Sequence, residues 1–339
     1  MKSFTCRICG NALYFENSVC VSCGTSLGYS RAEHEIVPVD DTGTYTDTSG
    51  GVWHVCANLN LSGCTWLTPT PGGLCFSCSL TRTRPNDADA AGIAEYPVAE
   101  RAKRQLIAEL DRLGFPVIGK VDTDAAPGDP AEGLAFDLLS SAAQPVVTGQ
   151  ENGVVTIDLA ESDDAYREQI RDKLDEPYRT MLGHFRHEVG HYYEWLLVRG
   201  DERMARSREL FGDESADYQA ALDRHYASGP PDGWQDSFIS AYATMHPFED
   251  FAETWAHYLH ICDTVETAAA YGLISVDPID WRMPFRQLVT DVWVPLSTAL
   301  NMINRSMGKD DLYPFVIAGP VLDKLDFVAS LRPLPLPVG

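Results

Sequence analysis

The sequence predicts an α+β protein with a small cysteine-rich domain in front of a larger domain. Two observations support this prediction. In the larger part of the chain, short β-prone runs precede helical periodicity, and eight of the nine cysteines lie between residues 6 and 78. We place the boundary at residue 85, so the expected domains are residues 1–85 and 86–339. A chain of 339 residues is long enough for two such domains.

Charged residues, like the cysteines, are unevenly distributed between the two expected domains. Residues 1–85 hold 5 Lys or Arg and 6 Asp or Glu, a net charge of −1, whereas residues 86–339 hold 21 and 43, a net charge of −22. Nucleic acids are bound through clustered Lys and Arg that neutralise phosphates, so this composition argues against a nucleic-acid partner. The chain has neither an apolar run of about 18 residues nor a secretory signal, which predicts a cytoplasmic protein without a membrane partner.

The first four cysteines form two identical pairs, each with the pattern Cys-x-x-Cys-Gly. They are Cys6 with Cys9 and Cys20 with Cys23. Each Cys-x-x-Cys turn brings two thiolates within reach of one ion, and the following glycine suits a left-handed turn. Two such turns predict a zinc ribbon with one structural zinc ion held by four cysteines.

The next four cysteines are spaced more loosely. They are Cys56, Cys64, Cys75 and Cys78. We predict a second structural zinc site here, with His54 as an alternative to Cys56 and with buried free thiols as the competing interpretation. Residues 1–85 form too small a core to be held by apolar burial alone, so zinc is expected to stabilise the double ribbon. Without a basic cluster, its expected role is protein docking or structural support.

The larger domain is expected to begin with a helix and to continue with strands. Apolar spacing predicts a helix over residues 95–113 that stops at Gly114. β-prone runs follow at residues 116–121, 134–139, 146–148 and 154–159. Asn152-Gly153 predicts a hairpin between the last two runs. From about residue 164 the periodicity becomes helical: a first helix runs toward Leu174, and Pro177 opens a second helix.

That second helix carries the motif His-Glu-Val-Gly-His at residues 187–191. Histidines at i and i+4 lie on one helix face and can bind one zinc ion, with Glu188 beside the water that the ion activates. A catalytic zinc site needs a third protein ligand and one open position. A helix opened by Pro247 carries Glu249 and Glu253 on one face. We predict that Glu249 is the third ligand and that Glu253 accepts the second N–H of a ligand histidine.

These two segments resemble the gluzincin metallopeptidases. Within them, the segment Glu249-Asp250-Phe251-Ala252-Glu253 is most similar to the lethal-factor-like arrangement, in which Glu-x-x-x-Glu supplies the third ligand and a supporting carboxylate. Nearly the whole chain, with its ribbons and residues 178–186 before the motif, resembles a family of zinc-binding metallopeptidases with zinc ribbons. The resemblance implies a zincin-like fold for residues 86–339.

The same resemblance implies a tyrosine seven residues before the glutamate ligand, where its hydroxyl stabilises the oxyanion. In this chain that residue is Tyr242. His246 is the rival donor for this role.

The leading hypothesis is a zinc-dependent peptidase that hydrolyses peptide bonds in a peptide or protein substrate. His187, His191 and Glu249 hold the catalytic zinc ion, which joins the two structural ones. Glu188 acts as the general base, which takes a proton from water and passes it to the leaving amine. We expect the substrate to pair with an edge strand, for which residues 134–140 and 153–159 are the candidates.

Two other functions remain open at this stage. The first is a zinc-built protein-interaction scaffold that cleaves nothing. The intact Glu188 argues against it, because a scaffold needs no base at that position. The second is a protease that its ribbons bring to DNA, and the net charge of −22 in residues 86–339 argues against that function.

Overall fold

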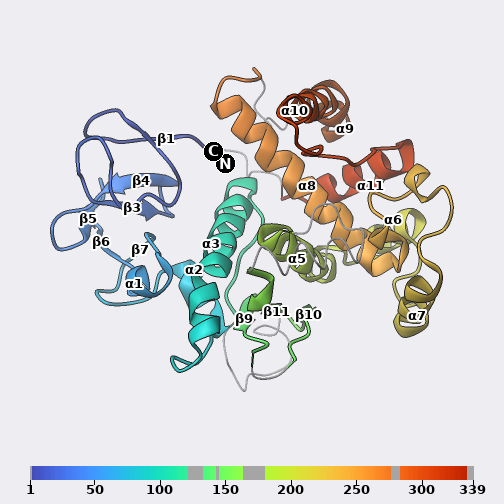
Figure 1. Cartoon of the computed structure of the whole chain (residues 1–339), viewed down its shortest axis with the longest axis horizontal. Helices are drawn as coiled ribbons and strands as arrows, with labels where there is room; N and C mark the ends of the chain where they lie inside the picture. The colour runs from blue at the N-terminus through green and yellow to red at the C-terminus, as the bar shows by residue number, and fades with distance from the viewer. Residues whose placement is uncertain (1, 121–132, 143–144, 163–179, 276–282, 334–339) are drawn as a thin grey trace. The chain divides into compact units, whose positions relative to one another are not determined.

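The computed structural model describes residues 2–120, 133–142, 145–162, 180–275 and 283–333. It has the mixed α+β architecture that the sequence predicts (Figure 1). The chain forms two compact units, unit 1 (Met1–Arg167) and unit 2 (Glu168–Gly339). The domain boundary at residue 85 falls inside unit 1 and stays a prediction. Within the described ranges, no helix combines the length and the hydropathy that a membrane span requires.

Unit 1 begins with short antiparallel strands around the cysteines. The strands are β1 (Phe4–Thr5) with β2 (Ala12–Leu13), β3 (Leu27–Ser30) with β4 (Glu35–Pro38), and the three-stranded set β5 (Thr44–Thr46), β6 (Val52–Val55) and β7 (Leu67–Thr68). Two one-turn helices follow, α1 (Leu59–Ser62) and α2 (Phe76–Ser79). The Tyr29 ring lies 4.9 Å from Phe15 and 4.8 Å from Trp66, so a small aromatic core joins these strands.

A long helix and a four-stranded sheet complete unit 1. Helix α3 (Ala90–Leu113) is capped by the Asp89 side chain and ends, as predicted, at Gly114, whose φ is 77°. The sheet has the order β10 (Gly149–Glu151), β11 (Val154–Asp158), β9 (Ala135–Leu139) and β8 (Thr81–Thr83). Strand β9 is parallel to both of its neighbours, whereas β10 and β11 are antiparallel. The 3-10 turn η2 (Leu159–Ser162) follows β11.

The predicted hairpin is confirmed, because Asn152 and Gly153 have φ values of 51° and 80° and join β10 to β11. Two of the β-prone runs become β9 and β11. The run at 146–148 lies just before β10, and the described part of 116–121 forms only the bridge between Gly119 and Leu134.

The prediction of an edge strand at 134–140 or 153–159 is wrong. Strand β11 is paired on both sides by β10 and β9, and β9 is paired on both sides by β11 and β8. Strand β8 comes from the cysteine-rich region, far from β9 in the sequence. Strand β8 pairs with Phe136 and Asp137 of β9, and β10 pairs with residues 154–156 of β11, so neither candidate segment is an edge strand.

Unit 2 is helical in its described part. Its helices are α5 (Met181–Leu197), α6 (Asp201–Phe211), α7 (Tyr218–Ser228), α8 (Pro247–Ala270), α9 (Phe285–Leu288), α10 (Val294–Ser306) and α11 (Gly319–Ser330), with the shorter turns η3 (Trp234–Asp236), η4 (Tyr242–Thr244) and η5 (Val289–Trp293). The helix predicted from residue 164, Pro177 and residues 178–179 lie outside the described residues. The motif helix α5 begins at Met181, where the Thr180 hydroxyl caps it by accepting the N–H of Gly183, so the prediction that Pro177 opens this helix is wrong. Helix α8 opens at Pro247, as predicted.

Helices α5 and α8 pack against each other within unit 2 (Figure 1). A Cβ atom at Gly190 would lie 2.9 Å from the Cα atom of Ala252, a distance that real Cβ atoms essentially never show. Beside this point, the buried rings of Tyr193 and Trp255 stack with their centroids 4.7 Å apart. Gly190, inside the His-Glu-Val-Gly-His motif, therefore permits the close approach of the two helices that carry the predicted ligands.

A buried ion pair fastens α11 to the start of α8. Lys324 Nζ lies 2.6 Å from Asp250 Oδ2, and it also donates to the carbonyl oxygen of Ser237 at 2.7 Å. Burial raises the pKa of Asp250 to about 7, although Lys324 opposes this shift. The pair thus ties three segments around the first turn of α8, which contains Glu249.

Candidate metal centres

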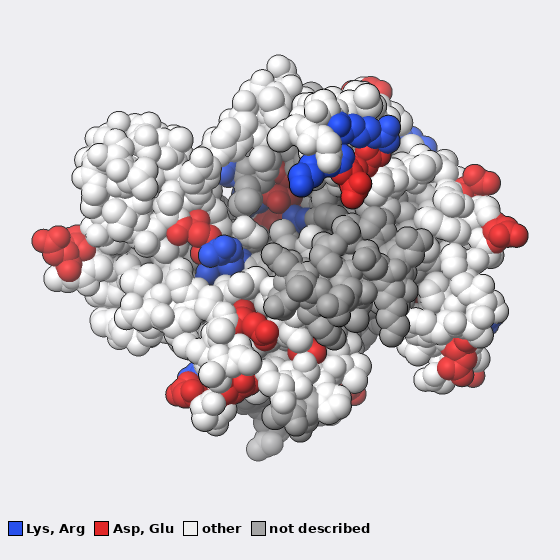
Figure 2. Space-filling model, in the orientation of Figure 1, with Lys and Arg blue, Asp and Glu red and all other residues white. Residues whose placement is uncertain are grey.

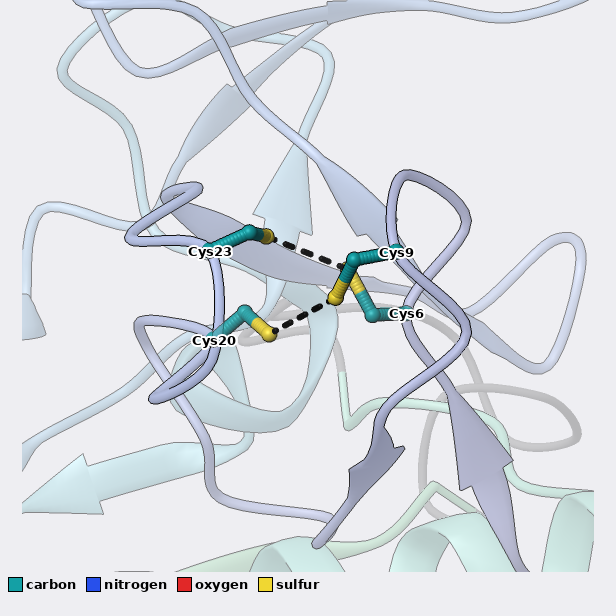
Figure 3. A group of neighbouring side chains, drawn as sticks. All are labelled: Cys6, Cys9, Cys20 and Cys23. Carbon is teal, nitrogen blue, oxygen red and sulfur yellow. Dashed lines mark hydrogen bonds between the residues drawn. The ribbon is translucent and has the colours of Figure 1, made fainter.

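The first cysteine cluster consists of Cys6, Cys9, Cys20 and Cys23, whose sulfur atoms all lie within 4.8 Å of one another (Figure 3). The closest pairs are Cys6 with Cys23 at 3.8 Å and Cys9 with Cys20 at 3.6 Å. Gly10 and Gly24 have φ values of 76° and 75°, so both turns have the predicted left-handed form. Cys9 and Cys23 are exposed.

The second cysteine cluster consists of Cys56, Cys64, Cys75 and Cys78, and all four are buried. Cys56 Sγ accepts a hydrogen bond from the backbone N–H of Cys75 at 3.2 Å. His54 is outside the cluster, because it lies on β6 and its Nδ1 contacts the Thr44 hydroxyl at 3.3 Å. The group therefore contains Cys56 and not the alternative ligand. Four thiolates in each cluster suit structural zinc.

Charged residues of α3 lie beside the second cluster. Cys78 Sγ lies 3.8 Å from Glu100 Oε2, and the other oxygen of Glu100 is 2.7 Å from Lys103 Nζ. The side chains of Glu100 and Lys103 are fully buried. Arg104 next to them pairs with Glu16 of the ribbon region at 2.8 Å. The second cluster is thus joined to α3 by buried polar contacts.

The third group of metal-ligating side chains joins α5 to α8. Glu249 Oε2 lies 3.0 Å from His187 Nε2 and 3.5 Å from His191 Nε2. The two imidazole rings are nearly perpendicular, at 86°, with centroids 4.9 Å apart. All three ligand atoms lie within 4.8 Å of one another. Two imidazole nitrogens and one carboxylate oxygen that converge in this way are the donor set of catalytic zinc sites.

The two histidines have different surroundings. His187 Nδ1 lies 2.7 Å from Glu253 Oε1, and Ser240 Oγ donates to the other oxygen of Glu253 at 2.7 Å. Such a carboxylate fixes the imidazole tautomer, so that Nε2 faces Glu249. The His191 ring instead stacks on Phe248, with centroids 3.9 Å apart, and its Nδ1 has no hydrogen-bond partner among the described residues.

Burial and neighbouring charged groups shift the pKa values of these side chains in opposite directions. Burial alone would lower the pKa of His187, but Glu249 and Glu253 outweigh it and raise that pKa well above its ordinary value. Burial alone would raise the pKa of Glu249, but the two imidazoles bring it well below the ordinary value. The pKa of Glu253 is lowered by His187 against burial in the same way. The carboxylates are therefore held in the ionised form, which binds cations.

Glu188 lies on the same helix and is 8% exposed. Its Oε2 atom is buried and makes no hydrogen bond within the part of the chain that the structure describes. An unpaired buried carboxylate oxygen is costly unless something at the site satisfies it. A carboxylate oxygen without a hydrogen-bond partner is free to accept a proton from a water molecule bound at this site.

The two candidate oxyanion donors have different contacts. The Tyr242 ring lies 6.0 Å from the His187 ring, and burial, with Glu249 nearby, raises the pKa of Tyr242 so that it keeps its proton. His246 caps α8, because its Nδ1 accepts the N–H of Phe248 at 3.1 Å while its Nε2 donates to the carbonyl oxygen of Ala216 at 3.1 Å. Both nitrogens of His246 are engaged within the chain, and the Tyr242 hydroxyl contacts that of Tyr218.

The sequence prediction did not include two residues that donate hydrogen bonds to Glu249 and Glu253. Ser240 supports Glu253, and Tyr218, the first residue of α7, donates its hydroxyl hydrogen to Glu249 Oε1 at 2.8 Å. Tyr218 lies 31 residues before Glu249. The local pattern around it marks only a helix start, at Asp217, so no motif could have identified it.

Comparison with known proteins supports this description. A family model described as "Putative zinc-binding metallo-peptidase" matches residues 92–331, and a zinc-ribbon domain model matches residues 3–89. Uncharacterized proteins from Mycobacterium bovis and Mycobacterium tuberculosis are each 52% identical over 339 residues, with 98% of this chain and 95% of each relative covered. No solved structure gives a significant match. The family model covers more than half of the chain, including the His-His-Glu group, so this protein belongs to that zinc-binding metallopeptidase family and carries a zinc-ribbon domain in front.

Proposed function

We propose that this protein is a zinc-dependent peptidase of the gluzincin type, with the lethal-factor-like pair Glu249 and Glu253. The observation that carries the proposal is the unpartnered buried oxygen of Glu188 on the helix that supplies His187 and His191. A scaffold without activity has no need of a base on the helix that carries the two histidines. A zinc ion held here supplies a Lewis acid that polarises the scissile carbonyl and acidifies water.

The residues around the cluster then have distinct roles. Glu188 takes a proton from the attacking water and passes it to the leaving amine. Tyr242 donates a hydrogen bond to the oxyanion, a contribution of about 3 kcal/mol in comparable sites. Its raised pKa keeps the phenol protonated for this purpose. Glu253, itself held by Ser240, keeps His187 in the tautomer that binds through Nε2.

For the ribbons we propose two structural zinc ions and a role in protein docking or structural support. Their residues carry a net charge of −1. On the face that Figure 2 draws, the left-hand part of the molecule, which holds the ribbons, is mostly white and shows no continuous basic patch. Phosphate recognition needs clustered basic side chains, so a role in binding DNA is not proposed.

The test is a Glu188→Gln variant, which keeps the shape of the side chain and removes the base. We expect hydrolysis of a peptide library to fall by about 10²–10⁴-fold, while three zinc ions per chain are retained. His187→Ala should retain two zinc ions. The matched control is Glu202→Gln, an exposed glutamate in α6, which should leave the rate unchanged. A wild-type protein that binds three zinc ions and cleaves no peptide, with or without a chelator, would support the scaffold instead.

A further inference from the structure

The contact between α7 and Glu249 leads to an inference that rests on the proposed zinc site. We infer that Tyr218 is a positioning residue for Glu249: its hydroxyl occupies one carboxylate oxygen and thereby directs the other toward the two imidazoles. No motif or family resemblance assigns this role to Tyr218.

The two oxygens of Glu249 have separate partners. Oε1 accepts the hydrogen bond from Tyr218 at 2.8 Å, while Oε2 lies 3.0 Å from His187 Nε2 and 3.5 Å from His191 Nε2. Glu249 is only 3% exposed, so solvent competes little for either oxygen. When one oxygen is engaged by a phenol, the carboxylate offers a metal ion a single oxygen. Ligation through one oxygen leaves room at a catalytic site for water and substrate.

Tyr218 is itself held in place by the start of α8. Its ring lies 5.3 Å from the ring of His246, which caps α8. The Nε2 atom of His246 also contacts the carbonyl oxygen of Ala216, two residues before Tyr218. Within α7, whose residues are all described, Ala221 alone is buried. The contacts of Ala216 and Tyr218 thus hold the first turn of α7, and they place the Tyr218 hydroxyl on Glu249.

The experiment compares Tyr218→Phe with the wild-type protein. The affinity for the third zinc ion is measured by competition with a chelator, and we expect it to fall by about 10–100-fold in the variant, the usual effect of losing a group that supports a metal ligand. The matched control is Tyr226→Phe, which makes the same change on the same helix at a residue that is 62% exposed. This control should bind zinc as the wild type does.

A spectroscopic measurement separates positioning from a general loss of fold. With zinc in both cysteine clusters and Co²⁺ in the third site, visible absorption reports the number and geometry of the cobalt ligands. We expect the spectrum to change in Tyr218→Phe and to stay the same in Tyr226→Phe. An unchanged affinity and spectrum in Tyr218→Phe would overturn the inference and leave the proposed peptidase intact. A wild-type protein that binds only two zinc ions would overturn both.

Discussion

The cysteine clusters of unit 1 and the His-His-Glu cluster of unit 2 are built in opposite ways. In the first cysteine cluster, each pair of ligands lies on one short turn whose shape depends on one glycine. The His-His-Glu cluster instead joins two long helices, and His187 and Glu249 are 62 residues apart. Ligands on turns can gather before any large core exists, whereas ligands on helices meet only when the helices pack. Unit 1 should therefore need its metal in order to fold, and unit 2 should need its fold in order to bind metal.

The largest effect is expected from Cys64→Ser in the second cysteine cluster. Cys64 is fully buried, and structural zinc contributes about 10–16 kcal/mol in zinc-finger peptides, as much as the whole stability of a typical domain. We expect unit 1 to lose its resistance to proteolysis, as measured by limited digestion with mass spectrometry. Cys9→Ser, at an exposed position of the first cluster, should have a smaller effect.

His187→Ala provides the other half of this comparison. It should lose one zinc ion while both units stay resistant to protease, because the packing of α5 on α8 does not depend on that side chain alone. If Cys64→Ser leaves residues 81–158 protected, metal is not what holds unit 1 together.

An intermediate effect is expected from Gly190→Ala, which alters the helix contact and leaves every ligand in place. The new Cβ would lie 2.9 Å from the Ala252 backbone, so α5 and α8 must separate. Overpacking of this kind costs about 1–3 kcal/mol. We expect a lower midpoint of urea denaturation and weaker binding of the third zinc ion. Gly319→Ala in α11, where a Cβ meets no atom within 4 Å, is the control and should be neutral. Wild-type zinc affinity in Gly190→Ala would refute the dependence on helix spacing.

The smallest effect concerns the pH dependence of the stability of unit 2, to which the buried side chain of His257 should contribute. Burial lowers the pKa of His257 to about 4, and its Nδ1 contacts the Tyr313 hydroxyl at 2.8 Å. As pH falls from 7 to 5, the unfolded chain takes up the proton before the folded one does, so folding loses about 2 kcal/mol from this residue. His257→Gln should reduce that loss, as measured by urea denaturation at both pH values. Equal losses in both proteins would contradict the assignment.

The sequence was sufficient to predict which side chains gather in the three clusters but not which residues contact them. The Cys-x-x-Cys-Gly repeats and the i, i+4 spacing of Glu249 and Glu253 are local patterns, and each places its side chains without knowledge of the fold. Gly190, Ser240 and Tyr218 act through contacts between segments that are distant in the chain. Such contacts depend on which helices pack together, and the periodicity of a sequence does not predict helix pairing.

The strand order was unpredictable for the same reason. The runs at 134–139 and 154–159 were recognised as β-prone, but their places in the sheet depend on β8, which lies more than 50 residues before β9. Pairing between such distant segments leaves no trace in the pattern of either one.

Strand β8 has a practical consequence for work with the ribbons. It begins three residues after Cys78, and its Arg82 Nε lies 3.0 Å from Asp137 Oδ1 of β9, so the last part of the cysteine-rich region is built into the sheet. A recombinant fragment that ends near residue 89 would carry β8 with its hydrogen-bonding edge uncovered. Uncovered edges pair readily with other chains, so such a fragment should aggregate unless the segment up to β11 is included.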